Sequence, residues 1–198
     1  MVGAKMTRRL YVVTGAYSCG KTTTMKYLAA THGFGIHSEA HQRVLDDFGD
    51  RTRGHPPDEP FQPVNDPDHF CPMCRPLEFA ELVLLKQADI EAGAADGDFL
   101  ERGYLDPIEY YLRNTGSTVY PWGSNPPRFA HYRAVLLFAV LPEIQKPRWG
   151  KTREQRIAEA KMINERLLGL YRNAGFHCHI IEPGTVEERA DAVLRLLE

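Results

Sequence analysis

Short runs rich in hydrophobic residues alternate along this sequence with longer segments in which apolar residues recur at helical spacing. The runs predict five β-strands, at residues 8–14, 34–38, 99–101, 132–141 and 176–182. Helices are expected over residues 22–30, 39–48, 77–95, 106–115, 152–173 and 185–197. The 77–95 segment has its apolar residues at positions 79, 82, 85 and 90.

The order of these elements predicts the fold class. Strands that alternate with helices form a parallel sheet with right-handed crossovers and helices on both faces. The run at 132–141 is almost continuously Val, Leu and Phe, which suits a strand covered on both faces. We therefore predict an α/β protein with a three-layer architecture and a five-stranded parallel sheet. Any ligand is expected at the carboxyl ends of the strands.

Two segments follow neither a helical nor a strand period. Residues 49–76 contain seven prolines and form an irregular insert, and a loop of that length in a compact domain is usually functional or disordered. Residues 117–127 form a second loop, with Tyr120 and Trp122, and Phe129 follows closely. These aromatic side chains can stack on a base, cover a pocket or pack the loop onto the domain.

A glycine-rich segment between the first strand and the first helix carries the most specific motif. It fits the phosphate-binding pattern G-x-x-x-x-G-K-[ST] of a P-loop. Glycines let backbone N–H groups approach phosphate oxygens, and the helix N-terminus adds partial positive charge. Lys21 can reach the β- and γ-phosphates, and the Thr22 hydroxyl can ligate Mg²⁺. The predicted ligand is ATP or GTP with Mg²⁺, bound by Gly15, Ala16, Tyr17, Ser18, Cys19, Gly20, Lys21, Thr22 and Thr23.

Acidic residues follow the second and third predicted strands. Glu39 can take a proton from an acceptor hydroxyl or order a metal-bound water, or it can simply be an acid favourably placed in the first turn of a helix. Glu101 stands where a Walker-B acid belongs, so it is our second candidate ligand for Mg²⁺, through water.

Arg102 follows Glu101 directly. Its guanidinium can clamp an anionic or hydroxyl-bearing acceptor, or these two residues can form an ion pair at the sheet edge. Asp106, with Pro107 and Glu109, has the pattern of a helix N-cap, and this capping role suffices to explain it.

A basic stretch follows the fourth strand and runs into the next helix. Arg153 and Arg156 lie in the first turn of that helix, where cations are unfavourable unless an anion lies between them. This arrangement suits a lid that neutralises charge during phosphoryl transfer, although a solvated basic face explains it equally well.

Cys71 and Cys74 form half a zinc site by their spacing. His55 and His69 are near in sequence, but His69 is only two positions from Cys71, which is an unfavourable spacing, and no second cysteine pair exists. Zinc binding is one hypothesis for this pair, and two reduced thiols in an irregular loop are the alternative.

Composition sets wider limits. The chain has 198 residues and is 43% hydrophobic, enough for one folded domain over residues 1–198. A net charge of −2 provides no general attraction to nucleic acid or an anionic membrane. No stretch approaches the ~20 apolar residues of a membrane span, and the N-terminus lacks the apolar region of a signal peptide. We therefore expect a cytoplasmic protein, in which four cysteines do not indicate a disulfide framework.

Several segments together resemble a known family, the AAA-type P-loop ATPase domain related to the nicotinamide riboside kinase domain. The sequence is also broadly similar to P-loop nucleoside and nucleotide kinases. The matching residues are the 15–22 loop, Glu39-Ala40 with Arg43, the 101–106 stretch, the 171–176 stretch and Glu188-Arg189. The resemblance implies a P-loop NTPase/kinase-like fold, ATP or GTP with Mg²⁺, and phosphoryl transfer to a small acceptor. Glu rather than Asp at position 101, and the insert with its cysteines, depart from the family pattern.

The leading hypothesis is a phosphotransferase that acts on a small, nucleoside-like molecule. Its expected catalytic residues are Lys21, Glu39, Arg102, Arg153 and Arg156. The main rival is a regulatory NTPase that uses the 49–76 insert to dock a protein partner, and a weaker one is a kinase of nucleic-acid ends. A deep aromatic pocket favours the small molecule, and an open basic groove favours nucleic acid.

Overall fold

A computed structural model describes residues 9–49, 69–121 and 132–197, and within them five strands form one parallel sheet in the order β2-β3-β1-β4-β5. The strands are β1 (Leu10–Thr14), β2 (Ile36–His37), β3 (Phe99–Glu101), β4 (Tyr132–Phe138) and β5 (Cys178–Ile181). The helices are α1 (Lys21–His32), α2 (Ala40–Phe48), α3 (Pro76–Gly93), α4 (Leu105–Thr115), α5 (Arg153–Asn173) and α6 (Val186–Arg195), with a short 3-10 turn, η2, at Pro142–Ile144. The predicted α/β class and five-stranded parallel sheet are confirmed.

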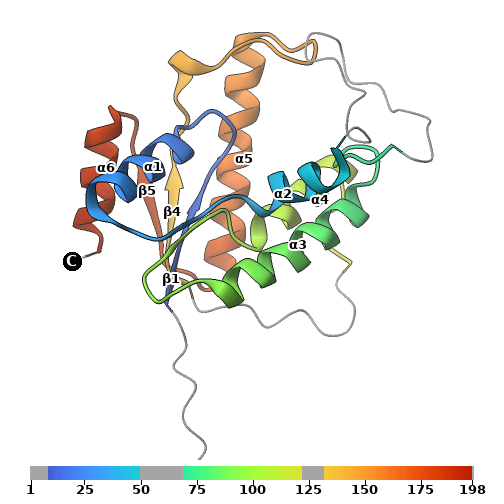
Figure 1. Cartoon of the computed structure of the whole chain (residues 1–198). Helices are drawn as coiled ribbons and strands as arrows, with labels where there is room; N and C mark the ends of the chain where they lie inside the picture. The colour runs from blue at the N-terminus through green and yellow to red at the C-terminus, as the bar shows by residue number, and fades with distance from the viewer. Residues whose placement is uncertain (1–8, 50–68, 122–131, 198) are drawn as a thin grey trace, which may run out of the picture.

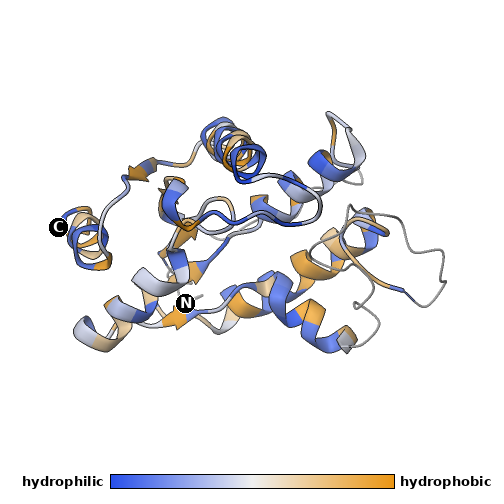
Figure 2. Cartoon of the chain, turned by 90° about the horizontal axis from the view of Figure 1, so that it is seen from above, coloured by the Kyte–Doolittle hydropathy of each residue, from blue (hydrophilic) through white to orange (hydrophobic). Residues whose placement is uncertain are grey.

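Helices cover both faces of this sheet. Successive residues of a strand point to opposite faces, so Val12 of β1 packs with residues of α2 to α5, whereas Val13 packs with residues of α1 and α6. Figure 1 shows α1 and α6 on one side of the strands and α2, α3, α4 and α5 on the other. Seen from above in Figure 2, hydrophobic strands lie in the middle and the helices carry both hydrophobic and hydrophilic residues. The result is three layers.

Strand β1 is central, and its neighbours bring polar residues to one edge of the sheet. Val13 pairs with Glu101 of β3, and Thr14 pairs with Leu137 of β4. Because the strands are parallel, their carboxyl ends meet at the same edge. The glycine loop after β1 and the acid that ends β3 therefore lie together.

Several strand and helix limits differ from their predicted positions. β2 has only two residues, and β4 ends at Phe138, although Val140 and Leu141 beyond it are buried. A run of hydrophobic residues indicates that a segment is buried. It does not show whether the backbone pairs with a neighbouring strand, and for this reason the predicted strand extended past the end of β4. Leu85 on α3 is 66% exposed because it lies six residues, or about 120° around the helix, from the buried Phe79.

The start of α4 corrects the interpretation of Asp106. The sequence predicted Asp106 as the N-cap, but Tyr104 occupies that position and the helix begins at Leu105. Asp106 instead lies in the first turn and is only 3% exposed. An N-cap role does not account for a carboxylate buried this deeply.

The Asp106 carboxylate joins four parts of the chain. It accepts hydrogen bonds from Thr14 Oγ1 at 2.6 Å, from Tyr171 OH at 2.7 Å and from the backbone N–H of Gly103 at 3.1 Å. Arg102 Nη1 donates to it at 2.9 Å. One buried side chain thereby connects the end of β1, the β3–α4 turn and helix α5.

The two irregular segments are described only at their ends. Residues 50–68 lie outside the described residues. The hypothesis that the insert docks a protein partner falls on these residues and stays a prediction. Trp122 and Phe129 also lie outside the described part of the chain. Tyr120 is buried against Tyr111, with ring centroids 5.0 Å apart, so this aromatic residue packs its loop onto the domain.

None of the described helices combines the length and the apolar character that a membrane span needs.

We expect Tyr171→Phe to lower the free energy of unfolding by about 1–3 kcal/mol, because it removes one donor from the buried Asp106 carboxylate. Denaturant titration measures the change. Tyr27→Phe, in a half-buried position on α1, is the control and should change stability by less than about 0.5 kcal/mol. Equal losses in the two variants would contradict a special role for the Asp106 hydrogen bonds.

Candidate functional site

The glycine loop between β1 and α1 depends on its glycines for both conformation and packing. Gly15 and Gly20 have φ angles of 136° and 77°, which side-chain-bearing residues rarely adopt. A Cβ atom on Gly20 would lie 1.8 Å from Arg189 Nη1, and one on Gly15 would lie 2.7 Å from the Phe138 carbonyl oxygen. The two positions therefore require glycine for steric reasons also.

Three polar side chains from distant elements hold the loop backbone. Asn164 of α5 accepts the Ala16 N–H at 2.7 Å through Oδ1 and donates from Nδ2 to the Phe138 carbonyl at 2.9 Å. Arg189 of α6 donates to the Cys19 carbonyl at 3.1 Å, and Gln145 donates to the Ser18 carbonyl at 3.0 Å. All three supporting side chains are buried, so the loop is preformed.

Lys21 and Thr22 begin α1 at the mouth of this loop. Lys21 Nζ donates to the carbonyl oxygens of Ala16 at 2.8 Å and Gly15 at 3.1 Å, while the Thr22 hydroxyl donates to Glu101 Oε1. Burial raises the pKa of Glu101, and the nearby Glu39 adds to this effect. A hydroxyl and a carboxylate side by side are ligands that Mg²⁺ prefers, and a cation there would favour the ionised Glu101. The donor set therefore fits magnesium.

Glu39, His41 and Arg102 form a charged cluster beside the loop. Arg102 Nε lies 3.0 Å from Glu39 Oε1, and Arg102 Nη1 also donates to the Gly15 carbonyl at 3.1 Å. Burial opposes the charge on Glu39, but Arg102 and its other neighbours outweigh this and lower the pKa of Glu39. Glu39 is therefore ionised at neutral pH.

The imidazole of His41 is uncharged in this cluster. Burial lowers the pKa of His41 from 6.5 to about 4, although Glu39 acts in the opposite direction. The 2.6 Å contact between His41 Nδ1 and Glu39 Oε2 therefore joins a neutral ring to a carboxylate at neutral pH.

A cavity of about 400 Å³ connects the loop with this cluster. It is lined by the 16–23 segment and also by Glu39, Arg102, Asp106, Glu109, Tyr110 and Arg113. Arg113 Nε lies 3.2 Å from Glu109, and the Arg113 guanidinium lies over the Tyr110 ring at 4.6 Å. Burial raises the pKa of Glu109 despite this arginine. The cavity thus joins a phosphate-binding loop to a pocket with both charges and an aromatic ring.

The two arginines of the predicted lid are not among the residues that line this cavity. Arg156 is buried, with its guanidinium 3.5 Å from the centroid of the Tyr17 ring. Arg153 is exposed and donates to the Pro142 carbonyl at 2.8 Å. The basic stretch therefore separates into one side chain packed against the loop and one at the surface.

Cys71 and Cys74 likewise do not line the cavity. The structure nevertheless brings His69 to them, contrary to our expectation from its sequence spacing.

Sequence analysis missed several residues of the site. Asn164 and Gln145 support the loop but belong to no motif, and Arg189 was noticed only within the family resemblance. Arg113 and Tyr110 lie in the helix after β3, and their position just beyond a strand end was the one available signal. His41 follows Glu39 by two residues and carried no ligand pattern of its own.

We expect stability to fall as pH decreases from about 6.5 towards 4, because the unfolded state binds a proton at His41 more readily than the folded state. Full protonation corresponds to about 3 kcal/mol for this one group. His41→Gln should remove that part of the pH dependence, measured by denaturant titration across the range. His32→Gln, exposed at the end of α1, is the control. An unchanged pH dependence in His41→Gln would show that His41 is not buried in its neutral form.

Three solved structures share the fold of this chain. Deoxyadenosine kinase from M. mycoides with bound dATP has a TM-score of 0.58 at 13% identity, over 95% of this chain and 98% of that chain. The NadR protein in complex with NR has a TM-score of 0.59 at 13% identity, over 96% of this chain but 51% of NadR, so this chain spans about half of that protein. Shikimate kinase from Acinetobacter baumannii in complex with shikimate has a TM-score of 0.50 at 14% identity, over 98% and 94% of the two chains. These likenesses confirm the predicted P-loop NTPase/kinase-like fold.

Sequence comparison agrees with the fold. No curated protein sequence matches this chain significantly. The family model described as AAA domain matches residues 10–189, from the first residue of β1 to the arginine that holds the glycine loop. This match confirms the resemblance predicted from the P-loop and the strand-end residues. Because the model covers most of the sequence, the chain belongs to the AAA domain family.

Proposed function

We propose that this protein is a cytoplasmic, magnesium-dependent P-loop kinase that transfers the terminal phosphoryl group of ATP or GTP to a hydroxyl group of a small, nucleoside-like molecule. The observation that carries the proposal is that the 16–23 loop lines the same cavity as Glu39, Arg102 and Arg113. Its volume of about 400 Å³ suits a small molecule, since such sites usually measure about 300–1,000 Å³. A phosphate donor and a small acceptor can meet there.

The nucleotide is assigned to the glycine-loop side of the cavity. Backbone N–H groups of the loop and the N-terminus of α1 receive the phosphates. In the structure Lys21 Nζ contacts two loop carbonyls, and it would exchange them for phosphate oxygens. Thr22 and Glu101 would hold Mg²⁺, which neutralises charge on the transferring phosphate when bound. Thr23 lines the same cavity.

Glu39 is the proposed base. Its lowered pKa keeps the carboxylate ionised, and it lines the same cavity as the loop. The acceptor hydroxyl loses its proton to Glu39 as its oxygen forms a bond to the terminal phosphorus. The bond from that phosphorus to the bridging oxygen breaks, and the nucleoside diphosphate leaves with the electron pair. Arg102, held between Glu39 and Asp106, orients the acceptor.

The part of the cavity around Tyr110 and Arg113 is suited to a polar molecule that also carries a flat ring. Tyr110 adds an aromatic ring, which is stacked with His41 and covered by the Arg113 guanidinium, while Arg113 and Glu109 add a donor and an acceptor of hydrogen bonds. Two of the similar structures are a deoxyadenosine kinase and a NadR protein in complex with NR, and this favours a nucleoside-like acceptor by analogy of fold.

Arg156 is the better placed of the two lid candidates. It packs on Tyr17, which is itself a residue of the phosphate-binding loop, so a small movement would bring it towards a bound phosphate. Arg153 would have to leave the Pro142 carbonyl to take part. Both would then stabilise negative charge during transfer.

The deciding experiment is turnover of Mg-ATP and Mg-GTP with a panel of nucleosides and small hydroxyl-bearing metabolites. We expect nucleoside-dependent release of ADP or GDP, with phosphate appearing on the nucleoside. Slow hydrolysis that no acceptor stimulates would instead indicate the regulatory NTPase. Phosphorylation of an oligonucleotide end alone would indicate the nucleic-acid kinase.

Glu39→Gln should lower kcat for the acceptor reaction by about 10²–10⁴-fold, because the amide cannot accept the hydroxyl proton. Nucleotide binding, followed by calorimetry, should change little. Lys21→Ala is the contrasting variant and should weaken nucleotide binding, while Glu78→Gln on the exposed start of α3 should alter neither property. Full turnover in Glu39→Gln with nucleotide still bound would exclude Glu39 as the base.

Arg113→Lys should raise KM for the acceptor by about tenfold or more, since a lysine keeps the charge beside Glu109 but loses the planar fork of donors. KM for the nucleotide should rise less, because Arg113 reaches the glycine loop only indirectly, through Glu159, which lies 3.9 Å from Arg113 Nη1 and accepts the Tyr17 hydroxyl. A parallel rise in both KM values would place the effect in the overall structure of the cavity.

A further inference from the structure

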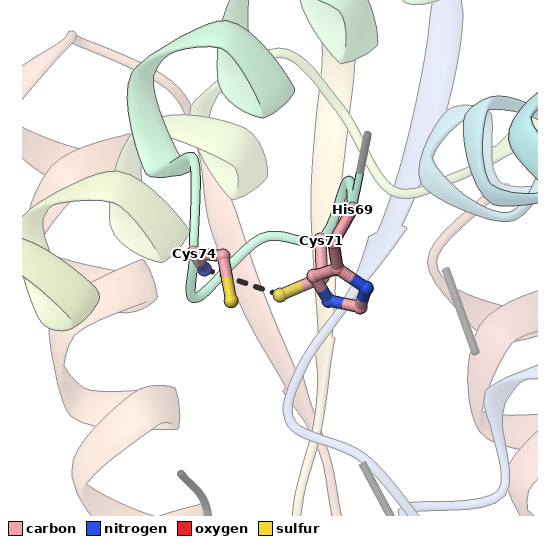
Figure 3. A group of neighbouring side chains, drawn as sticks. All are labelled: His69, Cys71 and Cys74. Carbon is pink, nitrogen blue, oxygen red and sulfur yellow. Dashed lines mark hydrogen bonds between the residues drawn. The ribbon is translucent and has the colours of Figure 1, made fainter. Parts of the chain in front are cut away.

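A second group of reactive side chains lies in the segment that leads into α3. His69, Cys71 and Cys74 each offer one ligand atom, and these atoms all lie within 4.8 Å of one another. Figure 3 shows the two sulfur atoms and the imidazole ring gathered at one place. None of the three lines the cavity described above, so they form a separate centre.

The backbone of this segment is arranged around the Cys71 sulfur. The Cys74 N–H points to Cys71 Sγ at 3.1 Å, drawn as the dashed line in Figure 3, and the Arg75 N–H donates to the Cys71 carbonyl at 2.9 Å. N–H groups directed at a sulfur stabilise its thiolate form. The turn continues into α3, whose N-terminus adds partial positive charge near the cysteines. Both features act towards the thiolate form that binds metals, against the stronger effect of burial.

Packing holds the segment in position. His69 and Cys71 are 4% and 3% exposed. Phe70, between them, stacks on Phe48 at the end of α2 with ring centroids 3.9 Å apart and lies 5.8 Å from the Phe79 ring of α3. Asn114 of α4 donates to the Pro72 carbonyl at 3.0 Å. Three helices therefore fix the segment, and the three ligand atoms are brought together before any ion binds.

We infer that His69, Cys71 and Cys74 bind one zinc ion, with the fourth coordination position left to water or another ligand. Ligands at about 2.0–2.3 Å from a tetrahedral zinc lie about 3.3–3.8 Å apart, so the observed spacing needs a contraction of about 1.5 Å at most. Two soft thiolates and one imidazole select zinc over magnesium or calcium. The ion would join α2, α3 and α4 at the point where the segment meets them.

Zinc must displace a proton from the buried thiol. Burial raises the pKa of Cys71 to about 11, and the neighbouring Cys74 contributes to this rise. Zinc takes the place of the thiol proton, so zinc binding releases a proton and its affinity depends on pH.

The test uses the untagged full-length protein, purified under reducing conditions. We expect about one zinc ion per chain by elemental analysis after dialysis. Replacement by cobalt should produce intense visible bands of a tetrahedral ion and thiolate-to-cobalt bands in the near ultraviolet. The cobalt spectrum of the wild-type chain does not depend on whether any variant folds.

Cys71→Ser and Cys74→Ser should each lose the thiolate-to-cobalt intensity and weaken zinc binding by about tenfold or more, and His69→Gln should shift the visible bands. Cys178→Ser and His177→Gln, in and beside β5, are the matched controls and should retain zinc and the wild-type spectrum.

A wild-type chain that retains no zinc and gives no tetrahedral cobalt spectrum would overturn the inference. Binding that persists in both cysteine variants would do the same. A Cys71–Cys74 disulfide found in protein purified without reductant, combined with absence of zinc from the reduced protein, would replace the metal site with a redox pair. None of these experiments measures kinase turnover. Their outcome therefore tests the zinc site independently of the proposed function.

Discussion

The buried carboxylate of Asp106 holds together the part of the molecule where the sheet meets its ligand. A charge at 3% exposure is costly unless it is fully hydrogen-bonded, and Asp106 receives donors from the end of β1, the β3–α4 turn, Arg102 and α5. These donors come from positions as far apart as 14 and 171, so satisfying one carboxylate constrains several elements at once. The shape of the candidate site depends on this constraint.

Arg102 links Asp106 to two other groups that surround the cavity, Glu39 and the glycine loop. Its guanidinium contacts Asp106, Glu39 and the Gly15 carbonyl, and it therefore connects the charged cluster with the glycine loop. The backbone of Arg102 has a φ of 72°, a conformation that costs about 1–3 kcal/mol in a residue with a side chain. The Arg102 N–H donates to the Val13 carbonyl, and Gln87 donates to the Arg102 carbonyl, which together with the charged contacts maintain it. Strain at this position is consistent with a positioning task.

Helices α2 and α4 contribute side chains to the cavity lining, and α3 packs against both of these helices. They pack against one another on one face of the sheet, and the 69–75 segment joins them through Phe70 and Asn114. An ion at His69, Cys71 and Cys74 would order this group of helices from a point outside the cavity. Of these helices, α2 carries His41 and α4 carries Glu109 and Arg113, so rigidity at the segment bears on the geometry of the cavity.

The sequence alone determined the features that depend on local pattern. Hydrophobic periodicity predicted the strands and helices, and capping boxes at Thr152 and Thr185 stand at the starts of two helices predicted there. The spacing of Gly15, Gly20 and Lys21 identified the phosphate-binding loop, because its chemistry lies within eight consecutive residues. Strand order then brought Glu39 and Glu101 to the same edge of the sheet. These inferences use only neighbours in sequence and the direction of parallel strands.

Only the tertiary structure decided which side chains meet. Asp106 looked like a helix cap because its main partners, Thr14 and Tyr171, are 92 and 65 residues away. Arg156 looked like part of an open lid, yet its guanidinium packs on Tyr17. His69 looked unfavourably spaced, but the turn before α3 brings its ring to the cysteines. Contacts of this kind depend on rotamers and on packing between distant elements, and no local pattern of hydrophobic and polar residues encodes them.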